Sequence, residues 1–415
     1  MIDKIKLISF CLLIAIFSSC SRTNHKTLEV FRNVNPEIIE KDIQDYVMSN
    51  GKGVKINISN PADQEILKLS TIIDSISYIK LSNDPRATIG EINKIEFMSD
   101  GIYILDRYKT KSLKKFTLTG EFICQIGSHG EGPHEYVEPT DYAITDNDVI
   151  VYDQFKQRMI FYDHIGNYKR DMKVPFLFLK FHRFSSNKYI FYSLDQDNDH
   201  LQSIVNNSIF ECDSNFSLKY RGFHRIKNMY NSFFIENNFS NVGNKVFYHP
   251  TYSDTIFSIA DNGLIKNEFI FDFGKRKLPK NYTLSEMTKE LRSACDENYY
   301  IIFSGNNYVV LDDFLYFTFS KRHSVYHGIY SKSTGRTAIG NAIMNDVAPI
   351  FNIQNVLTGQ KNTLIGYLQP ADIVNGFKST DRKLWVRKIG EKYTRIAEQM
   401  SEGDNPILLF YHLKK

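Results

Sequence analysis

Two stretches of the sequence decide the fold: Gly101-Ile-Tyr-Ile-Leu-Asp106 and Asp148-Val-Ile-Val-Tyr-Asp153. Each is a short run rich in β-branched and aromatic residues, which favour β-strands. Their terminal aspartates, Asp106 and Asp153, are 47 residues apart. A polar turn with basic residues follows each stretch, 107–111 in the first case and 154–158 in the second. The same local pattern therefore occurs twice.

A second matched pair of segments, 114–122 and 160–168, follows the first. Phe116 corresponds to Tyr162 and Gly120 to Gly166, and both pairs are 46 residues apart. Two features that keep one offset to within a residue indicate a repeated unit. The unit consists of strand, Asp, polar turn, strand, turn with Gly, and strand. The glycine would supply the positive φ of a tight hairpin turn.

The period of 46–47 residues lies between those of WD40 and kelch repeats, in which each unit is a four-stranded blade. Strand-like segments remain at both ends of the chain, at 77–81, 383–387 and 406–411. If the two ends pair in one blade, they close a ring and remove its open edge. The sequence therefore predicts an all-β, six-bladed β-propeller of four-stranded antiparallel blades, with five or seven blades as open alternatives. Weaker copies of the unit occur at 187–192 with 208–215, 245–249 with 255–263, and 313–318 with 328–335.

One short helix is expected within this all-β pattern. Thr283-Leu-Ser-Glu286 has the form of a capping box, and Met287, Leu291, Ala294 and Cys295 follow at helical spacing. We predict an amphipathic helix over 283–295 that packs on the outside of the domain or over one mouth of the ring.

The composition supports a folded, strand-rich chain. The 415 residues are 42% hydrophobic and 24% charged, which argues against a disordered chain and against a polytopic membrane protein. The aromatic residues are 31 Phe and 25 Tyr with a single Trp. The net charge is +4 and no run of five like charges occurs, so the footprint of a nucleic-acid partner is missing.

The N-terminus has the features of an export signal. Lys4 and Lys6 flank the start of an apolar stretch, 5–17, which is followed by Ser18-Ser19-Cys20. This stretch is shorter than the ~20 residues that a membrane-spanning helix needs. The segment resembles the bacterial lipobox, which implies cleavage before Cys20 and attachment of lipid to that residue. A plain secretory signal cut nearby is the alternative.

These assignments divide the chain into a lipoprotein signal peptide at 1–19, a lipidated Cys20 with tether and N-terminal extension at 20–54, and a propeller domain at 55–415. We expect the protein to be anchored by lipid to the outer membrane. Surface-exported lipoproteins of Bacteroidota-type bacteria resemble one another in carrying acidic residues just after the lipidated Cys. The tether 21–26 contains none, and this departure favours a periplasm-facing protein over surface display. Without the signal and Cys20, three cysteines remain, Cys124, Cys212 and Cys295, and they form neither a disulfide framework nor a metal-binding pair.

The chain resembles the six-bladed β-propeller lipoproteins of Bacteroidota-type bacteria, which are similar to NHL-repeat propellers. The resemblance runs from about residue 55 to the C-terminus, and His134 departs from the small residue expected between Pro133 and Glu135. It implies a fold and a place in the cell envelope more than an activity. The segments that carry it are Leu81, 89–92, 104–106, 120–122, 130–136 and 404–406.

Candidate ligand contacts lie between the two repeats. The loop 127–136 has an unusual glycine-rich composition, and its alternative role is that of a simple crossover between blades. Asp141 and Tyr142 lie where the innermost strand of a blade should begin, near the channel mouth; the alternative for Asp141 is a turn cap. Asp106 and Asp153 recur at one repeat position, so we expect a structural hydrogen bond in each blade. The predicted ligand-binding residues are His129, His134, Glu135, Tyr136, Asp141 and Tyr142.

The leading functional hypothesis is a binding module rather than an enzyme. Loops that converge on one axial mouth would present Tyr and Phe side chains to a glycan, a peptide or an envelope protein. The alternative is a metal-dependent hydrolase or lyase that resembles lactonase-type propellers, with Asp141 and Glu135 among the ligands of a divalent cation. No cofactor is predicted outside that alternative. A purely structural or sensory role in an envelope assembly is the third hypothesis.

Overall fold

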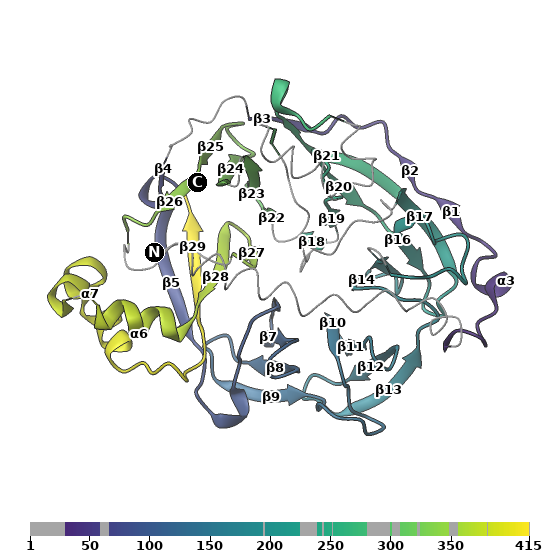
Figure 1. Ribbon diagram of the computed structural model, residues 1–415, viewed down its shortest axis with the longest axis horizontal. Coiled ribbons are helices and arrows are strands. Elements are labelled where there is room, and N and C mark those ends of the chain that lie inside the picture. Colours follow the sequence, from purple (N-terminus) through teal and green to yellow (C-terminus); the bar gives the residue numbers. More distant parts are fainter. Residues whose placement is uncertain are drawn as a thin grey trace, which may run out of the picture.

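Six β-sheets surround a central axis, as Figure 1 shows for the computed structural model of the chain. The structure describes residues 30–58, 66–193, 196–224, 239–242, 245–250, 252–279, 299–300, 308–321, 324–347, 356–379 and 381–414. Each sheet contains a four-stranded antiparallel blade, and the strands follow one another from the axis outward. The protein is an all-β, six-bladed propeller, as the repeat predicted.

Blades 1 to 3 come from consecutive segments of the chain. Their strands, from the axis outward, are β6 (Lys94–Met98), β7 (Gly101–Asp106), β8 (Ser112–Phe116) and β9 (Phe122–Ile126) in blade 1; β10 (Pro139–Ile144), β11 (Val149–Asp153), β12 (Arg158–Tyr162) and β13 (Tyr168–Lys173) in blade 2; and β14 (Lys180–Arg183), β15 (Tyr189–Tyr192), β16 (Asn207–Cys212) and β17 (Leu218–His224) in blade 3.

Blades 4 to 6 contain the weaker copies of the repeat and both ends of the ring. Their strands are β18 (Phe239–Val242), β19 (Lys245–Tyr248), β20 (Thr255–Ile259) and β21 (Leu264–Asp272) in blade 4; β22 (Tyr308–Val310), β23 (Phe314–Lys321), β24 (Ser324–Ser331) and β25 (Thr337–Gly340) in blade 5; and β27 (Thr358–Gln360), β28 (Thr363–Leu368), β29 (Ile407–Leu413) and β5 (Ile73–Lys80) in blade 6. Beside blade 5, β26 (Ala342–Met344) pairs in parallel with β4 (Ile66–Lys68).

The ring closes in blade 6. Three of its strands come from the C-terminal part of the chain, and β5 comes from the N-terminal part. β5 pairs antiparallel with β29, from Lys80 opposite Ile407 to Ile73 opposite Leu413. The pairing of the two ends that was predicted from 77–81 and 406–411 is confirmed for 77–80 and 407–411.

The hairpin glycines of the repeat have two physical roles. Gly120 and Gly166 have φ of +95° and +91°, which side-chain-bearing residues rarely adopt. A Cβ at Gly120 would also lie 2.3 Å from the carbonyl oxygen of Lys80, and one at Gly166 would lie 2.4 Å from that of Gln125. Each glycine therefore permits a tight turn and lets that turn touch the outer strand of the preceding blade.

The recurring aspartates fasten each blade to the crossover that leads into it. The carboxylate of Asp106 accepts hydrogen bonds from the backbone N–H groups of Gly90, Glu91 and Lys109. The carboxylate of Asp153 accepts from the corresponding groups of its own crossover and turn, among them Val137. Both aspartates are fully buried. The predicted structural hydrogen bonds are confirmed in blades 1 and 2.

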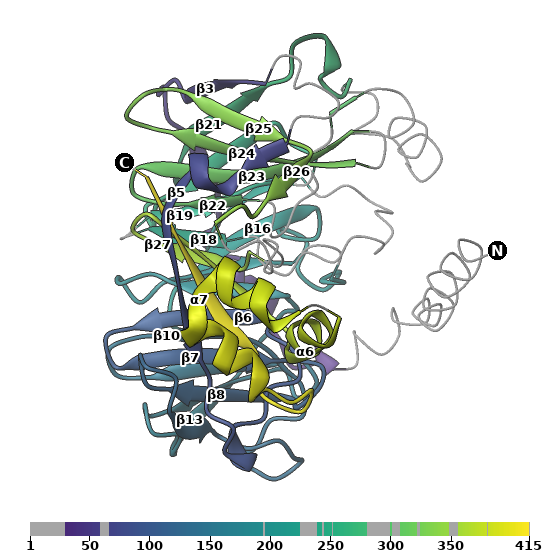
Figure 2. The same cartoon turned by 90° about the vertical axis from the view of Figure 1, so that its left-hand side faces the viewer.

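Two helices interrupt blade 6 between β28 and β29: α6 (Pro370–Lys378) and α7 (Arg382–Glu398). They pack on the outside of the blade, against β5 and β29 (Figure 2). The prediction of a strand at 383–387 is wrong, because these residues form the first turns of α7. The apolar run 384–386 is too short to separate strand from helix. The Asp381 carboxylate caps the helix at the backbone N–H of Lys383.

Other sequence predictions have mixed outcomes in the structure. The helix expected at 283–295 lies outside the described residues, as does Cys295. Cys124 is partly buried and Cys212 is buried, and neither forms a disulfide. Among the described residues, no helix is long and apolar enough to cross a membrane.

The N-terminal extension forms a strap along the outside of blades 3 and 4. After the short helix α3 (Pro36–Ile39), β1 (Gln44–Asp45) pairs in parallel with β17, and β2 (Val47–Met48) and β3 (Val54–Asn57) pair in parallel with β21. These strands cover the outer edges of two blades, which would otherwise present unpaired backbone groups.

A partly buried tyrosine and a buried carboxyl group join the strap to blade 3. The Tyr46 hydroxyl donates to Glu211 Oε1 at 2.8 Å, and its ring stacks on Tyr220 with the ring centroids 5.8 Å apart. Burial raises the pKa of the Glu211 carboxyl to about 8, although the bond from Tyr46 and the charge of Lys188 act in the opposite direction. The folded protein therefore holds a proton on Glu211 at neutral pH.

We predict that Glu211 makes the protein less stable as the pH rises. Between about pH 4.5, the ordinary carboxyl value, and pH 8, the folded state binds one more proton than the unfolded state, so stability falls across this window and levels off above it. Glu211→Gln keeps an acceptor for Tyr46 and cannot titrate. Urea unfolding at pH 6.5 and 8.5 should show wild type losing roughly 1 to 2 kcal/mol more than the variant. Equal losses in the two proteins would contradict the prediction.

Candidate functional site

The innermost strands β6, β10 and β14 begin at one end of the ring, which we call the upper mouth. The turn after the second strand of each blade lies at the same end, because Lys94 at the start of β6 pairs with Leu105 at the end of β7. In blade 2, Asp141 near the start of β10 pairs with Tyr152 near the end of β11. Side chains from these strand starts and turns therefore converge.

A charged cluster joins three blades just inside the upper mouth. Lys94 Nζ of blade 1 lies 2.9 Å from Asp141 Oδ1 of blade 2 and 3.1 Å from Glu96 Oε1. It also donates to the carbonyl oxygen of Tyr142 at 2.5 Å. The other oxygen of Asp141 accepts the backbone N–H of Phe181 in blade 3 at 2.9 Å. Asp141 is therefore a link between neighbouring blades.

The ionisation of this cluster suits recognition better than acid–base chemistry. Burial alone would lower the pKa of the Lys94 ammonium, but the carboxylates of Asp141 and Glu96 outweigh it and raise that pKa. His182 on β14 is affected by the same charges: burial and Lys94 lower its pKa to about 4. Lys94 is thus held as a cation and His182 as a neutral imidazole at physiological pH, so neither is poised for proton transfer.

A second polar chain runs along the rim of the upper mouth. Arg107, Gln154 and Gln196 come from equivalent turns of blades 1, 2 and 3. Arg107 Nη2 donates to Glu138 Oε1 at 2.8 Å and to Gln154 Oε1 at 3.4 Å, and Gln154 Nε2 donates to Gln196 Oε1 at 3.1 Å. Guanidinium, carboxylate and amide groups are therefore arranged in a row across three blades.

Two aromatic side chains flank this row at matching positions. Tyr108 follows Arg107 and is 46% exposed, and Phe155 follows Gln154 and is 69% exposed. The guanidinium carbon of Arg107 lies 5.0 Å from the centroid of the Tyr108 ring. Since the two rings are 47 residues apart in the repeat, the fold presents one exposed ring on each of two neighbouring blades.

The predicted loop 127–136 lies between blades 1 and 2, toward the outside of the ring. Tyr136 is buried, donates its hydroxyl proton to the carbonyl of Ile126 and accepts the N–H of Leu113. His134 is exposed and stacks on Tyr168 of the outermost strand, with the ring centroids 3.8 Å apart. Their contacts are those of a crossover, the alternative that the sequence left open.

The remaining residues of the loop face its own backbone or solvent. The Glu135 carboxylate accepts from the N–H of Gly132 and from the Ser128 hydroxyl, and His129 is exposed. Lys156, next to Phe155, donates to the carbonyl oxygens of Gly132 and Glu135 at 2.8 Å each. The loop is thereby fastened beside the exposed aromatic ring of blade 2.

The six residues predicted as ligand contacts fall into two groups. His129, His134, Glu135 and Tyr136 lie on the outer crossover, whereas Asp141 and Tyr142 lie on the innermost strand β10. Tyr142 is fully buried, and its hydroxyl donates to the carbonyl of Tyr103 in blade 1. Across the described ranges, no group of three or more His, Cys, Asp or Glu side chains is placed to hold a metal ion.

Sequence reasoning missed the residues that line the rim. Tyr108 and Phe155 lie within the two polar turns of the repeat. Each turn has a large aromatic residue at the same repeat position, and this recurrence was the available signal. Gln196 and His182 carry no such signal, because the third copy of the repeat diverges in sequence. Their positions become apparent only from the arrangement of the blades.

Comparison with known proteins identifies the family of this chain. A family model described as a domain of unknown function, DUF4934, matches residues 53–412. The chain belongs to the DUF4934 family. The match spans all six blades of this DUF4934 protein, including the helices α6 and α7. No curated protein matches the sequence.

Of three similar solved structures, the first shares the fold of the DUF4934 chain. A protein described as exported, from Bacteroides fragilis, is 17% identical, with a TM-score of 0.68 over 88% of this chain and 100% of that one. A DUF4221 member from Bacteroides vulgatus is 10% identical, with a TM-score of 0.45 over 82% and 97% of the two chains. The extracellular domain of a one-component system from B. thetaiotaomicron is 12% identical, with a TM-score of 0.35 over 65% and 30%.

We predict that the Lys94–Asp141 pair supports the ring more than the Lys94–Glu96 pair does. Asp141→Ala would leave a largely buried ammonium with a weaker partner and the N–H of Phe181 without its acceptor. It should cost about 3 kcal/mol of unfolding free energy in urea titrations. Glu96→Ala, which removes a more exposed partner, should cost less than about 1 kcal/mol. Equal costs would contradict this assignment.

Proposed function

We propose that the protein is a lipid-anchored binding module of the bacterial cell envelope that takes an oligosaccharide at the upper mouth. The observation that carries the proposal is the pair of exposed rings, Tyr108 and Phe155, beside the row of hydrogen-bonding side chains from three blades. Sugar rings have apolar faces that stack on aromatic side chains and hydroxyl groups that need donors and acceptors. The rim supplies both kinds of contact on one surface.

The chemistry of the mouth supports binding over hydrolysis. Lys94 is protonated and paired, and both oxygens of Asp141 are already engaged. The metal-dependent alternative would draw on Asp141 and Glu135. These two carboxylates serve different elements, the innermost strand of blade 2 and the outer crossover, and each already has polar partners.

The envelope location is supported by the sequence 1–20, with its cationic start, apolar stretch and Ser18-Ser19-Cys20. The similar protein of B. fragilis, described as exported, agrees with it. The described chain starts beside blades 2 and 3, where the Phe31 ring stacks on His200 with the centroids 4.2 Å apart. An anchor at Cys20 would therefore join the propeller at the outside of these blades, beside the loop after β15 that also carries Gln196.

We expect the two exposed rings to determine ligand affinity. In a screen of oligosaccharides against the chain from residue 21 onward, Tyr108→Ala and Phe155→Ala should each weaken binding of a hit about tenfold, because each removes a stacking surface. Leu118→Ala is the matched control. It removes an apolar side chain that is 51% exposed and lies at the end of blade 1 opposite the upper mouth. This change should leave the affinity for oligosaccharide unchanged.

Isothermal titration calorimetry on the hits would measure these affinities. Binding that survives both aromatic substitutions, or that Leu118→Ala weakens as strongly, would exclude the upper mouth as the site. A library in which peptides bind and oligosaccharides do not would replace the proposed ligand class by a peptide.

We also expect Cys20 to carry the lipid. Cells that express the full chain and grow with an alkyne-tagged fatty acid should incorporate label into the protein, and Cys20→Ser should abolish that incorporation and release the protein from the membrane fraction. Cys11→Ser, inside the signal segment, should have no effect. Label retained by Cys20→Ser would overturn lipidation at this residue without bearing on the sugar site.

A further inference from the structure

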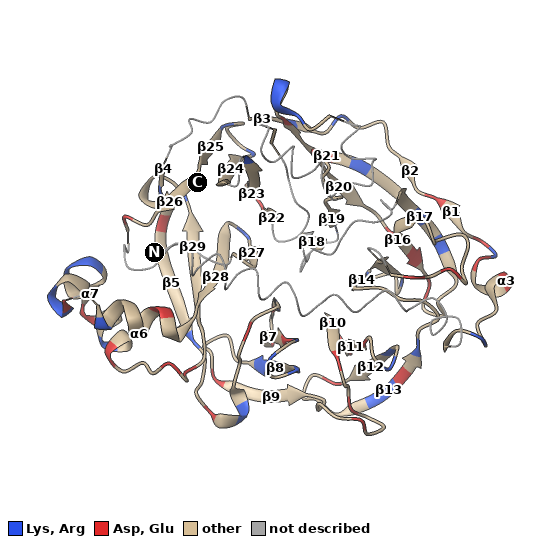
Figure 3. Ribbon diagram, in the orientation of Figure 1, with Lys and Arg blue, Asp and Glu red and all other residues tan. Residues whose placement is uncertain are grey.

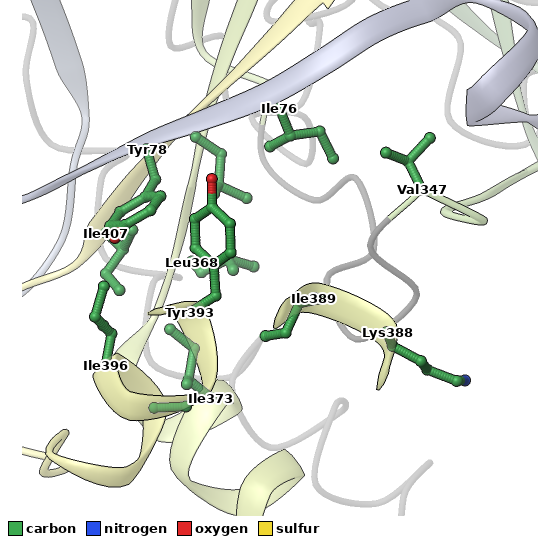
Figure 4. Close-up of a pocket in the computed structure, with 12 residues that line it drawn as sticks. Ile76, Tyr78, Val347, Leu368, Ile373, Lys388, Ile389, Tyr393, Ile396 and Ile407 are labelled. Carbon is green, nitrogen blue, oxygen red and sulfur yellow. The ribbon is translucent and has the colours of Figure 1, made fainter. Parts of the chain in front are cut away.

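A cavity lies on the outside of blade 6, and none of its described lining residues belongs to the clusters of the upper mouth. It has a volume of about 180 Å³ and lies between α6, α7 and the strands β5 and β29 (Figure 4). Side chains from both layers meet there: Ile76 and Tyr78 come from β5, and Ile373 and Tyr393 come from the helices. The centroids of the Tyr78 and Tyr393 rings are 4.8 Å apart, and the rings meet edge to face.

The walls of this cavity are almost entirely apolar. Among the described residues that line it, Lys388 is the one that carries a charge. Cavities of about 150 Å³ with aliphatic and aromatic walls stay dry and take up molecules the size of benzene, because water finds too few polar partners in them. The space in blade 6 is therefore suited to a short hydrocarbon chain or a single ring.

The opening of the cavity is cationic. The side chain of Lys388 stands at the rim and extends away from the apolar walls in Figure 4. α7 contains six basic and two acidic residues, and Figure 3 shows its positive turns at the outside of the molecule. The two acidic side chains, Glu391 and Glu398, pair with Arg382 and Arg395. Lys383, Arg387 and Lys388 remain as an exposed basic patch.

We propose that this cavity binds a medium-chain fatty acid. Its hydrocarbon chain occupies the space between α7 and β5, and its carboxylate lies at the opening beside Lys388. An anionic head with an apolar tail matches both features of the site, whereas a neutral hydrocarbon would use only one and a sugar neither. The site is separate from the upper mouth and does not depend on the function proposed for it.

The protein contains its own reporter for this site. Trp385 is the single tryptophan of the chain and is fully buried on α7. It belongs to the same apolar cluster as Ile373 and Ile389, which line the cavity, and its ring meets Phe377 edge to face at a centroid distance of 5.0 Å. Tryptophan emission therefore reports on the packing beside the cavity and on no other part of the molecule.

The test is a titration of the chain from residue 21 onward with sodium octanoate, followed by tryptophan emission. We expect a saturable change with one site per chain. Hexanoate should bind roughly tenfold more weakly than octanoate, because each buried methylene contributes about a fourfold gain in affinity. 1-Octanol, with the same chain and no charge, should bind at least threefold more weakly than octanoate.

Three variants locate the site. Lys388→Gln should weaken octanoate at least threefold and leave 1-octanol unchanged, whereas Lys383→Gln, on the same helix and outside the cavity lining, should alter neither. Ala397→Phe fills the cavity from α7 and should reduce octanoate affinity at least tenfold. Val347→Phe does the same from the more exposed rim, and serves if Ala397→Phe lowers the melting temperature.

Any of three results would overturn the proposal. The first is an absence of saturable binding by octanoate up to 10 mM, about the concentration at which an affinity near 1 mM would be evident. The second is equal affinity for octanoate and 1-octanol, which would mean a neutral apolar occupant. The third is octanoate binding that both folded cavity-filling variants leave unchanged, which would place the ligand elsewhere.

Discussion

The antiparallel pairing of β5 with β29 is the interaction on which the rest of the structure depends. It joins residues 73–80 to 407–413 and thereby converts five consecutive blades and one composite blade into a ring. A row of blades without this pairing would expose the edges of both terminal sheets. Because the contact spans almost the whole chain, every other inter-blade contact forms at lower entropic cost once it exists. The upper mouth exists only because the ring is closed.

Within the ring, polar side chains fix neighbouring blades in register at the point where their strands begin. Asp141 connects Lys94 of blade 1 to the backbone of blade 3, and Asp106 and Asp153 hold the crossovers that enter blades 1 and 2. Tyrosines add a second kind of link, since Tyr142 bonds to a carbonyl of blade 1 and Tyr308 of blade 5 bonds to one of blade 4. Asp141 and Tyr142, two of the residues that the sequence marks as possible ligand contacts, therefore align neighbouring blades.

Segments outside the six blades cover the outer edges of some blades and form additional surfaces. The N-terminal strap covers the outer strands of blades 3 and 4, and α6 and α7 cover that of blade 6. The strap brings Tyr46 against the buried Glu211, and the helices leave an apolar cavity with a basic rim. Both features lie outside the repeat, so neither follows from the pattern that predicts the blades.

The sequence by itself determined the strand–turn unit, the propeller and its closure by both ends, because alternation of apolar runs with hairpin glycines such as Gly120 and Gly166 is a local signal that recurs at a fixed period. It favoured six blades over five or seven, and the structure decided the number. It also marked Asp106 and Asp153 as structural. The prediction of a strand at 383–387 was wrong, because a short apolar run fits a strand and a helix equally well. The N-cap at Asp381 favours the helix. Only the tertiary structure decided which side chains meet: Lys94 with Asp141, Arg107 with Gln154 and Gln196, and β5 with α7. The physical reason is that these contacts join residues on different blades, and the sheet twist and ring closure that bring them together belong to the whole chain and to no single segment of it.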